Sequence, residues 1–367
     1  MKGTRQRPVR SLGIVVGGLL SVGTPLARAQ PPPPTYTFTI LDTLGGKASS
    51  AAGINDAGQI AGYATTADNQ THAVVWNGAK ATDLGASGGK ASFGHAINGA
   101  GLVAGDAYYI PGATGVGHAI RWEGSATITL GPLVGADSGA DGINGLGDVV
   151  GWMYKVGPGV SHAMRWKGTM SSDLGASLGA VHSEAVGVND AGLVVGNVYE
   201  DAETVHAVLW RDSEVTRLDS LGGPSSTVAA INNLGQAVGW AETAEKVDVG
   251  TRFESYITHA TLWRGATVTD LRPIGGNFSQ ARAINNSGQI VGRASFGSDG
   301  EALHAALWEG GQMVDLNSLL PADAVAAGWV LIDANGINEK GSIVGDAANS
   351  KMSQPPRAFL LSGESKR

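Results

Sequence analysis

Six histidines recur in one short motif and are the most regular candidates for chemistry in the sequence. In each copy Ala follows the His, and Trp stands four residues after it, as in His72-Ala73-Val74-Val75-Trp76; the other copies begin at His118, His162, His206, His259 and His304. Imidazole is the commonest metal ligand, but ligands must converge on one ion. Equivalent positions in successive repeats keep these six side chains apart. We therefore expect each His to hydrogen-bond a neighbouring turn, and we expect no metal site.

A second set of polar residues interrupts segments that are otherwise made of small residues. They precede a repeated Asn by three or five positions: His95, Asp141, Glu184, Gln280, Arg282, Asp333 and Asn335. If these segments converge, Glu184 or Asp141 would serve as acid or base, with His95 beside them and Arg282 as an anion clamp. The alternative is that all of them are channel-lining groups bonded to water.

Aromatic residues gather at or after the end of the second predicted strand of most repeats. The candidates for ligand binding are Tyr108, Tyr109, Trp152, Tyr154, Tyr199, Trp240 and Tyr256. Amphipathic rings offer stacking faces and hydroxyl groups to sugars or to a protein partner. The alternative is that they cap the core between repeats. The longest connection, Ala241–Thr258, is acidic and is expected to be a solvated loop.

The strands and turns that must position these residues recur along the chain. Seven Asn-x-x-Gly turns are spaced 43, 46, 45, 43, 53 and 53 residues apart, and we call their first residues the anchor asparagines: Asn55, Asn98, Asn144, Asn189, Asn232, Asn285 and Asn338. Asn bonds its own backbone in such a hairpin turn, and Gly supplies the positive φ. These turns resemble fragments of calcium loops but lack the run of oxygen ligands and the closing Glu. Calcium is left as an alternative, and no other cofactor is expected.

Each repeat predicts four short strands, and a period of 40 to 50 residues with four strands is typical of a propeller blade. We therefore predict an all-β, seven-bladed β-propeller over residues 35–362, with a β-solenoid as the alternative. The chain ends before a fourth strand of the last repeat. Residues 38–46 match residues 215–223, which form the fourth-strand region of another repeat. The N-terminal segment is thus expected to complete the last blade, because closure removes open sheet edges.

The N-terminal residues predict export. Residues 1–29 contain a basic start, an apolar run and the small-residue cleavage site Ala27-Arg28-Ala29, which together are typical of a secretory signal peptide. Residues 30–34 form a Pro-rich linker, and residues 363–367 a polar tail. The formal net charge of −7 argues against nucleic acid as a partner. No later segment is apolar enough to predict a transmembrane span, and the chain has no Cys.

The His-Ala-x-x-Trp and Ile-Asn-x-x-Gly motifs together resemble the bacterial extracellular HAF-repeat proteins. Only Arg357-Ala358-Phe359 keeps the Phe of that family's motif, and there Arg replaces the His. The resemblance implies a repeat fold and secretion, to the extracellular space or the periplasm. It implies no established reaction. We expect a non-enzymatic binding or scaffold module for an extracellular glycan or protein. The alternatives are a polysaccharide lyase or glycoside hydrolase at the channel mouth, and a structural surface or matrix protein.

Overall fold

The computed structural model describes most of the chain after the N-terminal segment. The described residues are 36–109, 116–131, 137–154, 159–168, 170–176, 178, 182–201, 203–212, 214–251, 255–273, 276–296 and 302–363. The predicted signal peptide, the Pro-rich linker and residues 364–367 of the polar tail lie outside them. Within these ranges, no helix is both long and apolar enough to cross a bilayer.

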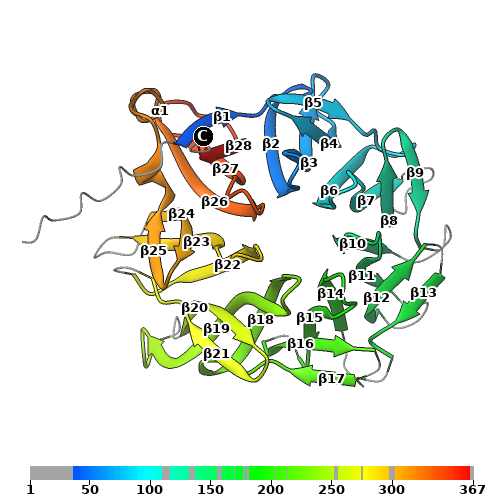
Figure 1. The fold of residues 1–367 in the computed structure, drawn as a ribbon, viewed down its shortest axis with the longest axis vertical. Helices are drawn as coiled ribbons and strands as arrows, with labels where there is room; N and C mark the ends of the chain where they lie inside the picture. Colours follow the sequence, from blue (N-terminus) through cyan, green and yellow to red (C-terminus); the bar gives the residue numbers. More distant parts are fainter. Residues whose placement is uncertain are drawn as a thin grey trace, which may run out of the picture. The chain divides into compact units, whose positions relative to one another are not determined.

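The described residues form an all-β, propeller-like fold of antiparallel strands that follow one another along the chain (Figure 1). Four of its sheets contain four consecutive strands each. Their bounds are β10 (Ser138–Ile143), β11 (Val149–Tyr154), β12 (Ser161–Lys167) and β13 (Met170–Asp173); β14 (His182–Val188), β15 (Val194–Tyr199), β16 (Val205–Arg211) and β17 (Glu214–Arg217); β18 (Gly222–Ile231), β19 (Gln236–Val247), β20 (Ser255–Arg264) and β21 (Thr267–Asp270); β22 (Ser279–Ile284), β23 (Ile290–Phe296), β24 (Ala302–Glu309) and β25 (Gln312–Asp315).

A larger sheet of eight strands precedes them. It contains β2 (Gly45–Ile54), β3 (Gln59–Thr66), β4 (Thr71–Asn77), β5 (Lys80–Asp83), β6 (Ala91–Ile97), β7 (Val103–Tyr109), β8 (Val116–Glu123) and β9 (Ala126–Thr129). Two four-stranded units make up this sheet, and one parallel pair, Thr71 with Ala91, joins them. The sequence predicts these units as separate sheets. The structure differs because β4 and β6 begin beside each other.

The sixth sheet combines the two ends of the described chain. Its strand order is β1-β28-β27-β26, with β1 (Tyr36–Ile40), β26 (Trp329–Ile337), β27 (Ile343–Asn349) and β28 (Arg357–Gly363). Strand β1 pairs antiparallel with β28, from Tyr36 opposite Gly363 to Ile40 opposite Phe359. The residues that follow β1 reach the next sheet, because the Asp42 carbonyl accepts a hydrogen bond from Trp76 Nε1 at 2.8 Å.

Two features of the longer repeats differ from the sequence predictions. The predicted loop Ala241–Thr258 is largely strand, since β19 and β20 extend as a long hairpin that pairs Lys246 with Tyr256. Two short helices, η1 (Leu316–Leu319) and α1 (Ala322–Ala327), occupy the last 53-residue spacing and were not predicted from the sequence. Six residues give too short a periodic pattern to indicate a helix before its position is known.

The seven anchor asparagines form a closed circle of hydrogen bonds, which we call the asparagine belt. Each buried side chain amide donates to the backbone carbonyl of the next anchor at 3.0 to 3.2 Å, and Asn338 donates back to Asn55. The Oδ1 atom meanwhile accepts backbone N–H groups of its own turn, as Asn144 does from Leu146 and Asp148. The turn bonds were predicted; the bonds between repeats were not.

Serine makes a second contact between neighbouring repeats. In six repeats a Ser six residues before the anchor accepts a hydrogen bond from the backbone of the preceding repeat's motif Ala, or of Ala358 in the last repeat, at 2.8 to 3.1 Å. The motif tryptophans beside these alanines are buried, which places the core between successive sheets. The first strand of every repeat then faces one central cavity of about 220 Å³, which we call the channel cavity.

Candidate functional site

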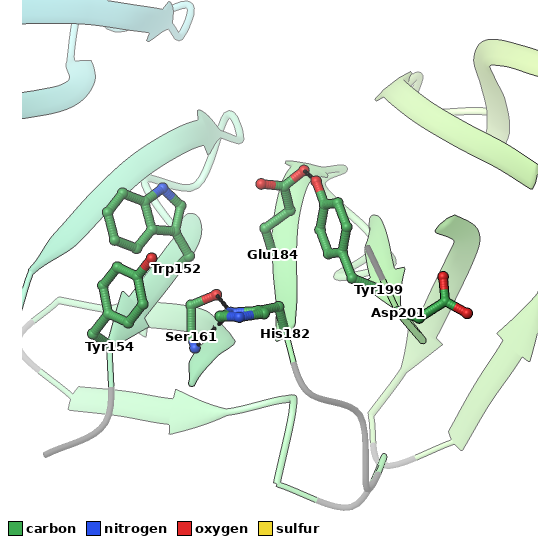
Figure 2. A pocket seen from close by; sticks show the side chains of 7 residues that line it. All are labelled: Trp152, Tyr154, Ser161, His182, Glu184, Tyr199 and Asp201. Atoms are coloured by element: carbon green, nitrogen blue, oxygen red, sulfur yellow. Dashed lines mark hydrogen bonds between the residues drawn. The ribbon is translucent and has the colours of Figure 1, made fainter. Parts of the chain in front are cut away.

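A cavity of about 580 Å³ lies between the sheet of β10–β13 and the sheet of β14–β17, and we call it the aromatic cavity (Figure 2). Its volume falls within the range of small-molecule sites, about 300–1,000 Å³. The lining residues are Trp152, Tyr154, Ser161, His182, Glu184, Tyr199 and Asp201. Trp152, Tyr154 and Tyr199 were predicted as ligand-binding residues, and Glu184 as a catalytic candidate. Ser161, His182 and Asp201 were missed.

Trp152 and Tyr154 form one wall of the aromatic cavity. They stand two residues apart on β11, so their side chains leave the same face of the sheet. Their rings meet edge to face, with centroids 5.6 Å apart and an interplanar angle of 82°. A Cβ at Gly139 would lie 2.7 Å from Trp152 Nε1, so the indole rests on bare backbone of the neighbouring strand. This close approach holds the indole in place.

Glu184 and Tyr199 form the facing part of the cavity. Tyr199 donates its hydroxyl to Glu184 Oε1 at 2.8 Å, and Asn197 Nδ2 donates to the same oxygen at 3.0 Å. Asn197 is itself fixed, because its Oδ1 accepts the Val228 N–H at 2.9 Å. Burial, followed by the charge of Glu184, raises the pKa of Tyr199 well above its usual value. The phenol therefore keeps its proton and stays a hydrogen-bond donor.

His182 and Ser161 complete the floor between these two walls (Figure 2). The Ser161 backbone N–H donates to His182 Nδ1 at 3.2 Å, and the Ser161 hydroxyl lies 3.1 Å from the same nitrogen. An Nδ1 atom that accepts a backbone N–H carries no proton, so the ring is the Nε2–H tautomer. His182 lies outside the repeated motif. The signal that could have found it is its position seven residues before an anchor, on the same strand as Glu184.

The channel cavity collects three of the four catalytic candidates. His95, Asp141 and Arg282 line it, whereas Glu184 lines the aromatic cavity. His95 Nε2 contacts Asp106 Oδ1. Burial lowers the pKa of His95, but the hydrogen bond and the charge of Asp106 outweigh burial and raise this pKa. The pKa of Asp141 is raised to about 7, mainly by burial. The charge of His95 lowers this pKa, and the charges of Glu184 and Asp106 raise it further.

Arg282 does not stand ready as an anion clamp. Its Nη2 donates to Asp333 Oδ2 at 2.9 Å, and Arg293 Nη1 lies 3.7 Å from the same oxygen. Arg293 also donates twice to Gln280 Oε1. An anion at Arg282 would therefore compete with Asp333 for the guanidinium. The sequence could not show this, because Arg282 and Asp333 are 51 residues apart.

Three other predicted aromatics, Tyr108, Trp240 and Tyr256, do not line the aromatic cavity. Tyr108 packs edge to face on Phe93, with centroids 6.0 Å apart, and burial with the charge of Asp106 raises its pKa to about 12. Tyr256 carries Lys246 over its ring at 4.4 Å. Trp240 pairs with Thr227 and Ala260 in another sheet. The backbone of Tyr109 belongs to β7, but its side chain lies outside the described part of the structure.

Four of the six motif histidines pair with a carboxylate of the adjacent fourth strand, not with a turn as predicted, whereas His206 Nε2 lies 3.2 Å from Glu200 Oε2. Four Nδ1 atoms lie 2.8 to 3.0 Å from the Asp eleven residues later, in the pairs His72–Asp83, His162–Asp173, His259–Asp270 and His304–Asp315. Burial raises the pKa of Asp270, but hydrogen bonds from His259 and from the Arg272 backbone outweigh it, so the pKa of Asp270 is lowered. Among the described residues, no three His, Asp or Glu side chains converge as metal ligands.

Comparison of the sequence with protein-family models and with curated proteins finds no match. Among solved structures, the chain is similar to the β-propeller domain of the trilobed protease from Pyrococcus furiosus, with 13% identity and a TM-score of 0.53 over 87% of this chain and 97% of that one. A Mycobacterium tuberculosis puromycin-hydrolysing peptidase gives 12% identity and a TM-score of 0.51, over 93% of this chain and 56% of the peptidase. At this identity the likeness concerns the fold alone, and it agrees with an all-β, propeller-like architecture.

Proposed function

We propose that this protein is a secreted binding module that recognises an extracellular glycan through the aromatic cavity. The observation that carries the proposal is the meeting of Trp152 and Tyr154 with the polar groups of His182, Glu184 and Tyr199 in one cavity. Sugar rings have apolar faces that stack on aromatic rings, and hydroxyl rims that need hydrogen-bond partners. A wall of rings opposite fixed polar groups matches both requirements.

The scaffold proposed for this site is a seven-bladed ring in which the eight-stranded sheet counts as two blades. Two observations support it: the asparagine belt has seven members and returns to Asn55, and β1 pairs with the last strand of the chain. We further propose that the chain is a HAF-repeat protein exported by residues 1–29. The repeated His-Ala-x-x-Trp motif supports this relationship.

Replacing Trp152 by Ala should weaken oligosaccharide binding about tenfold or more, because a central aromatic contact contributes about 1.4 kcal/mol or more to binding. Trp240→Ala is the matched control. Both tryptophans follow their anchor by eight residues on a second strand, but only Trp152 lines the cavity. Isothermal titration calorimetry against a panel of neutral, amino and acidic oligosaccharides measures both variants.

Equal weakening by both variants would mean that the sugar does not bind in the aromatic cavity. If no sugar of the panel binds the wild-type chain, a glycan function is wrong, and a protein partner or structural role takes its place. We expect EDTA to leave the affinity unchanged, whereas a loss of binding that calcium restores would revive the calcium alternative.

A glycoside hydrolase or lyase is the second candidate function, and Asp141 is the observation that favours it. A carboxyl group with a pKa of about 7 keeps a proton available near neutral pH, as a general acid needs. Glu184 lies close enough to Asp141 for its charge to contribute to that pKa. Release of new reducing ends from a bound oligosaccharide, lost in Asp141→Asn, would support catalysis. Binding without any turnover would leave only the binding module.

Asp141→Asn should also change the pH dependence of stability. The pKa of Asp141 is about 7 in the folded chain and about 3.9 when unfolded, so the folded state binds more protons between these values. Wild-type stability therefore falls as pH rises from 4 to 7. Because Asp141 is only partly buried and lines the channel cavity, we discount the effect for solvent screening and expect Asn to add about 1–2 kcal/mol at pH 8 and nothing at pH 4. Thermal unfolding measures this gain, with exposed Asp212→Asn as control; an equal gain at both pH values contradicts the assignment.

A further inference from the structure

The described residues that line the aromatic cavity carry charges of one sign. They include the carboxylates of Glu184 and Asp201, and none of them is Lys or Arg. The Nδ1 atom of the lining His182 is already engaged, because it accepts the Ser161 N–H. Anionic ligands such as uronates or phosphates would meet the carboxylates of Glu184 and Asp201 here. The cavity therefore favours a neutral or cationic ligand.

One oxygen of Glu184 is turned toward the aromatic wall. The two donors, Tyr199 Oη and Asn197 Nδ2, both approach Oε1, and among the described residues Oε2 receives no hydrogen bond. In Figure 2 the second carboxylate oxygen points to the side on which Trp152 lies, whereas Asp201 points away at the outer edge. A ligand between Glu184 and Trp152 would meet a carboxylate oxygen whose position is already fixed.

The opposite wall also favours a cation. The faces of Trp and Tyr rings attract ammonium groups within about 6 Å of the centroid, and Trp is the strongest of the aromatic side chains. The protein makes such a contact elsewhere, where Lys246 Nζ lies 4.4 Å from the centroid of Tyr256. In the aromatic cavity, Trp152 and Tyr154 face Glu184, and the described lining residues place no cation between them.

We propose that the aromatic cavity binds an ammonium group, carried by a glycan whose amino sugars are not acetylated. This inference rests on the glycan-binding function proposed above and names the class of sugar. The ammonium would form an ion pair with Glu184 Oε2, while the sugar ring stacks on Trp152. A neutral sugar would leave that carboxylate oxygen with a weaker partner, because hydrogen bonds between charged groups are the stronger ones.

The test compares tetramers of glucosamine, N-acetylglucosamine and galacturonate by calorimetry at one pH below neutral. We expect the wild type to bind the glucosamine tetramer about tenfold tighter than the acetylated tetramer, corresponding to about 1.4 kcal/mol, and not to bind galacturonate. The preference should shrink as salt is raised, because salt screens the ion pair. Equal affinity for the two amino-sugar tetramers, or tightest binding of galacturonate, would overturn the inference.

Two variants separate this inference from the proposed function. Glu184→Gln keeps an oxygen that accepts from Tyr199 and Asn197, so it preserves the local hydrogen bonds, but it removes the charge. It should abolish the preference, because loss of the charge weakens the glucosamine tetramer about tenfold more than the acetylated tetramer. Trp152→Ala should weaken both tetramers. If Glu184→Gln keeps the preference, the ammonium site is wrong although glycan binding stands; if no tetramer binds the wild type, both proposals fail.

Discussion

Removing residues 36–44 should lower the melting temperature by about 10 °C or more. This segment contributes β1 to the sheet of β26–β28, and Leu41, which has no exposed surface, to the core. Truncating a buried Leu alone costs about 2–5 kcal/mol, and each kcal/mol lowers the melting temperature by about 2–4 °C in a domain of about 150–250 residues and by somewhat less in this longer chain. The deletion also removes the carbonyl partners of Trp76 and Arg357, which belong to different sheets. Differential scanning calorimetry of the deleted chain measures the shift.

A peptide-addition experiment distinguishes the loss of the β1 contacts from a general effect of shortening the chain. A synthetic peptide of residues 36–44, added to the deleted chain, should restore part of the melting temperature, because its contacts are those of a sheet strand and need no covalent link. A scrambled peptide of the same composition should restore nothing. If the deleted chain melts at the wild-type temperature, the proposed closure by β1 is wrong.

Replacing Asn144 by Ala should destabilise the protein by about 3–5 kcal/mol. Asn144 is buried, its Oδ1 accepts the N–H groups of Leu146 and Asp148, and its Nδ2 donates to the Asn189 carbonyl at 3.0 Å. Ala would leave the N–H groups of Leu146 and Asp148 without this partner, and each unsatisfied buried group costs about 1–3 kcal/mol. The Asn189 carbonyl would lose one of two donors, since it also accepts the Gly192 N–H, which adds a smaller loss. Denaturant unfolding followed by Trp fluorescence measures the loss.

Two further variants show which bonds cause this loss. Asn233→Ala removes an exposed Asn of a neighbouring turn that bonds Asp190 at 2.8 Å, and should cost under about 1 kcal/mol. Asn144→Asp keeps the acceptor for its own turn but cannot donate to Asn189 when ionised. An Asp variant as stable as the wild type at pH 7 would mean that the asparagine belt contributes nothing and that turn chemistry explains the conserved spacing of the repeats within this chain.

The aromatic cavity was predictable only in part. Trp152, Tyr154 and Tyr199 stand out in the sequence because rings recur at the end of second strands, and Glu184 because it interrupts a run of small residues. Nothing in the sequence separates Trp152 from Trp240, since both occupy the same position of the repeat. Only the neighbouring repeat distinguishes them, because His182 and Glu184 stand opposite Trp152 in the cavity.

The sequence by itself determined the strands, the turns and their order. Its local signals, the Asn-x-x-Gly turns and the alternation of small and β-branched residues, act over a few positions and are readable without knowing the fold. The tertiary structure alone decided which repeats exchange hydrogen bonds, that Arg282 is paired with Asp333, and which aromatic residues share a cavity with Glu184. These contacts join residues that are about 30 to 50 positions apart, or nearly 300 where Asn338 meets Asn55. The pairing of such distant side chains depends on how the sheets pack against one another, which no local pattern specifies.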